Sequence, residues 1–323
     1  MMLVILSFSR ESLNFGDFIN YRQSILFDAW SLYFIKEFVF WGLASAIHEW
    51  TRSFEMTVYL MDAIFVTFLM LAMPSNGSSL RCREFALPMC ILLSFPILMG
   101  FTNIYRQIGG LSLFLYALYL YFNSDTKKWQ RHSIFIISGF CHNVFLAFYL
   151  LFLIQTQIKS QTIRNLITFS MVASTIIVNE LILKKASVIV GLNGVESGGD
   201  SRLVLVIMNV FAILNYKSIL PLIQPSIKLQ KIIEKIDSYQ SQIWGLLVSI
   251  VLGIYFLEES TSERLLTLCL IISLYLIVYK FSITRRTYIG PIAMNTLLAI
   301  MLILPAFVSK SATQLIFPQG LIN

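Results

Sequence analysis

The chain has 323 residues, of which 57% are hydrophobic and 13% are charged. Soluble domains average about 45–50% apolar and about 25% charged residues, so the composition excludes a soluble protein and indicates a polytopic membrane protein. The net charge of +7 would suggest a nucleic-acid partner in a soluble protein. Here the Lys and Arg residues stand in short loops between apolar runs, where they orient the chain in the bilayer. We therefore expect no nucleic-acid partner.

The beginning of the chain alternates between apolar and polar character. Residues 1–8 are apolar but too few to cross a membrane, which takes about 20 residues. Residues 9–28 are polar, and the following segment 29–50 is long enough to cross but contains Lys36 and Glu37. Charges inside such a segment favour a position in the membrane interface, or one that dips in and out.

A series of apolar stretches of helical length follows, and these stretches predict transmembrane helices. They cover about residues 55–73, 85–101, 107–122, 164–183, 203–216, 241–257, 265–280 and 288–308. No extended polar segment is present that could form a second, soluble domain. We predict an all-α protein with about 8–10 transmembrane helices, in a single multi-pass domain over residues 1–323.

One apolar segment, 133–155, is interrupted at residues 139–143, around His142. Basic loops are expected on the cytoplasmic side of a membrane. A single crossing by this segment would place the basic cluster of residues 217–235 outside, whereas a re-entrant or broken helix that turns near His142 keeps it inside. Such a break is tolerated only where protein or a water-filled cavity surrounds it, which is what a buried active site provides.

With this topology, polar and ionisable residues gather at the outer face, and an ionisable group inside a membrane is functional by default. The polar run 103–107 stands at the mouth of the helix 107–122, and His142 approaches from within the membrane. The candidate site residues are Arg10, Asp17, Tyr21, Glu37, Asn103, Arg106, Gln107, His142 and Arg264. The four cysteines form no CxxC pair and are interpreted as small core residues. We find no metal-ligand spacing of His and carboxylates.

Five short motifs occur in a particular order along the chain. They are GDFINY at 16–21, an apolar segment led by Glu37, NIYRQ at 103–107, SGFCHN around His142, and SERLLTL around Arg264. In this order and spacing the chain resembles the EpsG-like, Wzy-type family of polysaccharide polymerases. The resemblance covers nearly the whole chain and is greatest over residues 10–145.

The resemblance implies a membrane glycosyltransferase of the bacterial cytoplasmic (inner) membrane. Such an enzyme polymerises undecaprenyl-pyrophosphate-linked oligosaccharide repeat units into O-antigen, capsule or exopolysaccharide at the outer face. The resemblance also implies a flippase and a chain-length regulator as partner proteins. We expect no cofactor and no metal ion.

The chemistry of that reaction suggests roles for the candidate residues. A pyrophosphate leaving group calls for guanidinium partners, which are Arg106 and Arg264 with Arg10 in reserve. An acceptor hydroxyl calls for a general base, and we expect Asp17 or His142 in this role, with Glu37 in reserve. The remaining residues Tyr21, Asn103 and Gln107 complete the binding set.

Each residue also has an ordinary structural alternative. Arg106 could be a snorkelling anchor at a helix end, and His142 could be a hydrogen bonder between spans. Asp17 and Tyr21 could form a solvated turn, and Arg264 could only pair with acidic neighbours at the surface. His132, in a basic cytoplasmic turn, is not expected in the site. For the whole chain, a lipid-linked oligosaccharide transporter or flippase, an O-antigen ligase-type membrane transferase, and a structural partner of an assembly complex remain the alternatives.

Overall fold

The computed structural model describes residues 21–22, 37–73, 97, 101, 105–122, 127–158, 160, 162–163, 166–167, 170, 206, 209, 264–273 and 275–276. These residues are almost all helical and include no strand, which confirms the all-α prediction for this part of the chain. The chain divides into two compact units. The first comprises Met1–Leu150 with Phe281–Arg285, and the second comprises Leu151–Lys280 with Arg286–Asn323.

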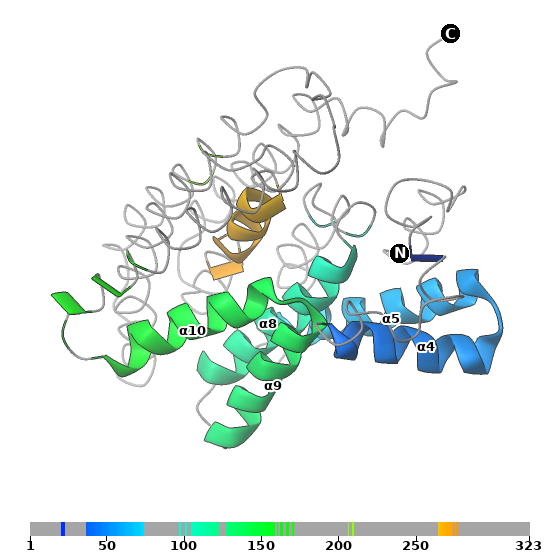
Figure 1. The fold of residues 1–323 in the computed structure, drawn as a ribbon, viewed down its shortest axis with the longest axis horizontal. Helices are drawn as coiled ribbons and strands as arrows, with labels where there is room; N and C mark the ends of the chain where they lie inside the picture. Colours follow the sequence, from blue (N-terminus) through cyan, green and yellow to red (C-terminus); the bar gives the residue numbers. More distant parts are fainter. Residues whose placement is uncertain are drawn as a thin grey trace, which may run out of the picture. The chain divides into compact units, whose positions relative to one another are not determined.

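Helices α4 (Phe38–Thr51) and α5 (Phe54–Ala72) form a tight hairpin in the first unit and lie side by side (Figure 1). The turn is made at Arg52, whose φ of 53° puts its backbone in the left-handed region that commonly ends a helix. Ser53 then caps α5, because its hydroxyl oxygen accepts the backbone N–H of Met56 at 3.3 Å. The hairpin therefore places the N-terminal end of α4 beside the C-terminal half of α5.

The two helices of this hairpin differ in length. α5 has 19 residues, about 28 Å at about 1.5 Å per residue, which is close to the roughly 30 Å of hydrocarbon in a bilayer. It is the one helix in the described ranges that is long and apolar enough to span a membrane. α4, with 14 residues, is about 21 Å long and too short to cross alone. The interfacial position of segment 29–50 and the multi-pass topology stay predictions.

Helix α8 (Tyr105–Phe122) packs between α5 and α9 (Lys128–Cys141). Most of its side chains are buried, including almost every residue from Ile108 to Leu118. The described α8 coincides with the apolar stretch predicted at 107–122 and begins two residues earlier. Its first turn therefore contains the polar end of the NIYRQ motif and brings it against the neighbouring helices.

A glycine pair in α8 allows this close packing. A Cβ atom added to Gly109 would lie 2.6 Å from Cζ of Phe65 in α5 and 3.1 Å from Sγ of Cys141 in α9. A Cβ added to Gly110 would come within 3.2 Å of the backbone carbonyl oxygen of Ser138. An added side chain at either glycine would force these neighbours to move, so the absence of a Cβ lets side chains of the adjacent helices pack directly on the backbone of α8.

The interruption predicted near His142 is confirmed. α9 ends at Cys141, and α10 (Val144–Gln157) begins after two residues, of which His142 has an extended backbone with φ −156° and ψ 125°. The N–H of His142 donates to the carbonyl oxygen of Ser138 at 3.0 Å, and its own carbonyl oxygen accepts the N–H of Phe145 at 3.0 Å. His142 therefore closes one helix and opens the next. Whether this broken helix re-enters the membrane stays a prediction.

The remaining apolar stretches are described less fully. The stretch predicted at 265–280 overlaps a described helical segment, Arg264–Ser273, in the second unit. There the side-chain amide of Asn209 donates to the carbonyl oxygen of Leu266 at 3.2 Å. The stretches 241–257 and 288–308 lie outside the described residues.

Candidate functional site

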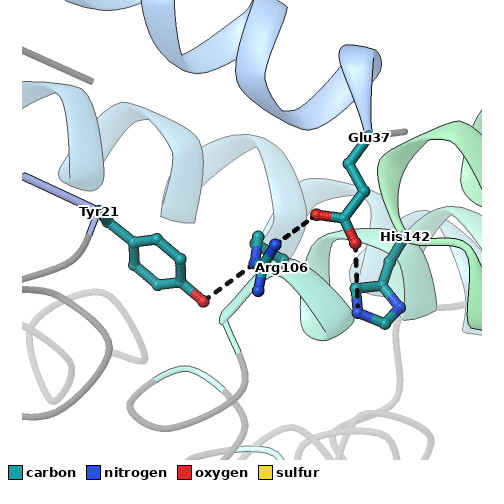
Figure 2. Close-up of polar contacts among 4 residues, drawn as sticks. All are labelled: Tyr21, Glu37, Arg106 and His142. Atoms are coloured by element: carbon teal, nitrogen blue, oxygen red, sulfur yellow. Dashed lines mark hydrogen bonds and ion pairs between the residues drawn. The ribbon is translucent and has the colours of Figure 1, made fainter. Parts of the chain in front are cut away.

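The candidate site is built around Glu37, which immediately precedes α4 and is only 5% exposed. A buried carboxylate is costly unless charged or hydrogen-bonding groups face it. Glu37 meets this requirement through both of its carboxylate oxygens, each of which faces a different cationic or ionisable side chain (Figure 2).

The first partner of Glu37 is Arg106, in the opening turn of α8. Nη1 of Arg106 donates to Oε2 of Glu37 at 2.6 Å. The two side chains are 23% and 6% exposed, so the pair is largely shielded from water. A charge-assisted hydrogen bond of this length is among the stronger contacts in proteins, and shielding strengthens it further. It connects positions that are 69 residues apart in the sequence.

The second partner is His142, at the junction between α9 and α10. Its Nε2 lies 3.4 Å from Oε1 of Glu37. A carboxylate facing Nε2 favours the tautomer that carries a proton there. A proton that His142 accepts from another group would then go to Nδ1. Carboxylate and imidazole together form the type of pair that orients a general base.

Aromatic rings enclose the guanidinium of Arg106. Its Nε donates to the hydroxyl oxygen of Tyr21 at 3.4 Å. Its Cζ lies 5.6 Å from the ring centroid of Tyr21 and 5.7 Å from that of Trp41. Both rings are more than nine-tenths buried. Cation–π contacts at these distances are favourable, and the rings fix the guanidinium while they exclude water from the pair with Glu37.

The site therefore combines two chemical capacities within one buried cluster. The guanidinium can bind an anion such as a phosphate group, and the imidazole, oriented by a carboxylate, can accept a proton. Because Glu37 contacts Arg106 and His142 through separate oxygens, the two capacities lie on either side of one carboxylate. Among the described residues, no group of three or more His, Cys, Asp or Glu side chains could hold a metal ion.

The structure brings four of the predicted site residues together: Tyr21, Glu37, Arg106 and His142 (Figure 2). Gln107 is half-buried beside Arg106. Arg264 begins the segment Arg264–Ser273 in the second unit, and its side chain is exposed. Arg10, Asp17 and Asn103 lie outside the described residues.

The structure gives Glu37 a more central position than sequence reasoning did. The sequence ranks it behind Asp17 and His142 as a base, whereas the structure makes it the residue that two other candidates share. Sequence reasoning also missed Trp41. Trp41 stands four residues after Glu37, and this spacing places both side chains on one face of a helix. The spacing could have indicated that Trp41 belongs to the site.

The described residues form a helical protein with one helix long and apolar enough to span a membrane and a buried Arg–carboxylate–His cluster. The family model of the EpsG family matches residues 1–319, so the chain belongs to that family. This confirms the resemblance to EpsG-like polymerases. No match was found among curated proteins or among solved structures. Membership indicates a membrane function in polysaccharide biosynthesis, of the glycosyltransferase-like polymerase type.

Proposed function

We propose that this protein polymerises undecaprenyl-pyrophosphate-linked oligosaccharide repeat units into O-antigen, capsule or exopolysaccharide. It does so as a multi-pass protein at the outer face of the bacterial inner membrane. The observation that carries the proposal is the bridging of Arg106 and His142 by Glu37 in a chain of the EpsG family. The cluster contains the groups that transfer from a lipid-pyrophosphate donor to a sugar hydroxyl requires.

Arg106 acts on the donor. As the bond between the anomeric carbon and the pyrophosphate oxygen breaks, negative charge grows on the leaving pyrophosphate. A guanidinium has five N–H donors, so the contacts of its Nε with Tyr21 and of its Nη1 with Glu37 are compatible with a further contact to a phosphate oxygen. The enclosure by Tyr21 and Trp41 fixes the direction of that contact.

His142 acts on the acceptor. The hydroxyl of the incoming repeat unit forms the new bond to the anomeric carbon and passes its proton to Nδ1 of His142. Glu37 holds Nε2 and stabilises the imidazolium that results. The proton then leaves with the released pyrophosphate or with solvent. In this proposal no step uses a metal ion or a cofactor.

The shared carboxylate also places the two substrates. Its oxygen Oε2 faces Arg106 and its oxygen Oε1 faces His142. A donor phosphate on the arginine and an acceptor hydroxyl at the imidazole are therefore neighbours. Holding two reactants in such proximity replaces a bimolecular encounter and contributes strongly to rate.

The proposal is tested in a deletion strain complemented with Arg106→Ala, Glu37→Gln or His142→Ala, with extracted glycans separated by gel. We expect loss of the polymer ladder while single repeat units stay attached. The matched controls are Arg131→Ala and His132→Ala, which change the same residue types at the other end of α9 and should preserve the ladder.

Other outcomes point elsewhere. Complete absence of surface repeat units in all three variants would indicate a flippase or an O-antigen ligase-type transferase. An unchanged ladder, with each variant present in the membrane by immunoblot, would remove the cluster from the reaction and overturn the proposal.

A further inference from the structure

The three helices that carry the charged cluster also carry polar side-chain atoms without hydrogen-bond partners. Three of these atoms lie on the side of the cluster: Nε1 of Trp41 in α4, Oε1 of Gln107 in α8 and Oγ of Ser138 in α9, whereas Nε of Arg131 lies at the other end of α9. All three atoms are buried, and none has a partner in the described parts of the chain. Buried polar atoms are nearly always paired in native proteins, so such exceptions require an explanation.

Trp41 lies one helical turn from Glu37, and its backbone N–H donates to the carbonyl oxygen of Glu37 at 3.1 Å. The residue is 7% exposed. Its ring centroid is 5.7 Å from Cζ of Arg106, and Nε1 is part of that ring. The unpaired donor therefore belongs to the ring that contacts the guanidinium of Arg106.

Ser138 lies one helical turn before His142, which donates its N–H to the carbonyl oxygen of Ser138 at 3.0 Å. The residue is fully buried, at 0% exposed. On the facing helix, Gly110 lies one turn after Arg106, and a Cβ added there would come within 3.2 Å of the carbonyl oxygen of Ser138. Ser138 is thus one turn deeper than His142, where α8 and α9 approach each other.

Gln107 follows Arg106 directly. The residue is half-buried, but its amide oxygen Oε1 is buried and unpaired. It occupies a different face of α8 from Arg106, because successive helical residues point about 100° apart. It therefore presents an unpaired acceptor on the face of α8 next to that of Arg106.

The chemistry of these atoms indicates what they bind. An indole N–H only donates, an amide oxygen only accepts, and a serine hydroxyl does both. None of the three carries a charge. A phosphate accepts hydrogen bonds and has no donor for an amide oxygen at neutral pH, whereas a sugar ring presents hydroxyl groups that both donate and accept. The set therefore matches a neutral sugar better than a phosphate.

We propose that Trp41, Ser138 and Gln107 form hydrogen bonds to sugar hydroxyls of the repeat unit next to the reacting centre. The proposal rests on the proposed polymerase function and assigns the sugar-binding part of the same site. Arg106 then binds the anionic part of the lipid-linked substrate and the three neutral groups bind its sugar. A polar atom that waits for a substrate stays unpaired in the free protein and is paired in the complex.

Trp41→Phe and Ser138→Ala test this, because each removes the polar atom and little else. The purified full chain is assayed in lipid nanodiscs with the lipid-linked repeat unit extracted from the deletion strain. We expect the KM for that substrate to rise about tenfold in each variant, the usual effect of one lost hydrogen bond, with a smaller change in kcat. The matched controls are Trp50→Phe in α4, which is exposed, and Ser133→Ala in α9, which is half-buried with its hydroxyl donating to the carbonyl oxygen of Trp129; both should keep the wild-type KM.

Thermal unfolding separates substrate binding from a structural role. Removing an unpaired buried polar atom does not lower stability, so we expect Trp41→Phe and Ser138→Ala to unfold at or above the wild-type temperature. A raised KM together with unreduced stability supports the proposal. An unchanged KM overturns it, and so does a fall in stability with a parallel fall in kcat, which indicates a packing role.

The same assay also distinguishes failure of the proposed sugar contacts from failure of the proposed polymerase function. If Arg106→Ala and His142→Ala abolish turnover but Trp41→Phe and Ser138→Ala leave the KM unchanged, the sugar contacts are wrong and the polymerase function stands. If Arg106→Ala and His142→Ala leave turnover intact, the proposed function itself fails and the sugar contacts fail with it.

Discussion

The two ends of the α8–α9 pair carry similar residues in different surroundings. Each end has an arginine whose guanidinium lies over a tyrosine ring, at 5.6 Å in one case and 5.5 Å in the other. Each also has a histidine that contacts another polar side chain. The first cluster consists of Arg106, Tyr21 and His142, and the second consists of Arg131, Tyr121 and His132.

The difference between the two ends is a buried acid. In the first cluster, Glu37 contacts both Arg106 and His142. In the second, the histidine Nδ1 lies 2.7 Å from the hydroxyl of Tyr149, and no ion pair joins Arg131 or His132 to an acidic side chain among the described residues. Residue type alone therefore does not make a reaction site here. A carboxylate that couples the cation to the imidazole separates the candidate site from a basic helix end of the kind that orients membrane proteins.

The largest effect is expected from removing that acid. Glu37→Ala leaves Arg106 partly buried without this carboxylate, which should lower the free energy of unfolding by about 3 kcal/mol and abolish the polymer ladder. Thermal unfolding of the purified protein and the glycan gel measure the two effects. Glu37→Asp, which restores a shorter carboxylate, is the control and should regain part of both. A stable, active Glu37→Ala protein would remove the distinction between the two ends.

The next effect comes from exchanging the arginines for lysine. Arg106→Lys keeps the charge but loses the fork that contacts Glu37 and Tyr21 together. We expect polymer formation to fall about 100-fold or more, within the range measured when a preorganised donor is lost. Arg131→Lys should retain the wild-type ladder. Equal losses in both variants would show that the two arginines are equivalent, contrary to the comparison.

A steric change at α8 should have an intermediate effect. The added methyl group in Gly110→Ala meets the ring of Phe145 and the carbonyl oxygen of Ser138, and overpacking of this kind costs about 1–3 kcal/mol. The glycine Gly42 in α4, which has nothing within 4 Å of an added Cβ, provides the control. Thermal unfolding should rank Gly110→Ala well below Gly42→Ala. The reverse order would contradict the packing of α8 described here.

The smallest effect is expected at the basic end. Tyr149→Phe removes one hydrogen bond to His132, worth about 1 kcal/mol of stability, and leaves the Phe135–Tyr149 ring stacking in place. The ladder should be unchanged and the unfolding temperature slightly lower. A loss of polymer in this variant would place the basic end in the reaction.

Much of this organisation is readable from the sequence. The helices around 55–73 and 107–122 follow from apolar length, and the break at His142 follows from the polar interruption of an apolar segment. Arg106 and His142 attract notice because ionisable groups are costly in a membrane. These features depend on local composition, which one sequence contains in full.

The pairing within the site depends on packing between distant segments, which composition does not encode. Glu37 contacts Arg106 across 69 positions, and a glycine pair in the same helix as Arg106 packs closely against neighbouring helices. From the sequence, Glu37 mainly indicates a segment that avoids crossing the bilayer. Trp41 reads as one more aromatic residue among many, since its unpaired N–H appears only when the surrounding side chains are placed.

His142 lies at the junction between two helices, α9 and α10. Its peptide group is the last hydrogen-bonded unit of α9 and its carbonyl supports the first turn of α10. A change in the angle between α9 and α10 would move the imidazole ring relative to Glu37. Arg106 lies in the first turn of a single helix, α8, and would not be moved in this way. A change in that angle would therefore alter the contact between Nε2 of His142 and Oε1 of Glu37.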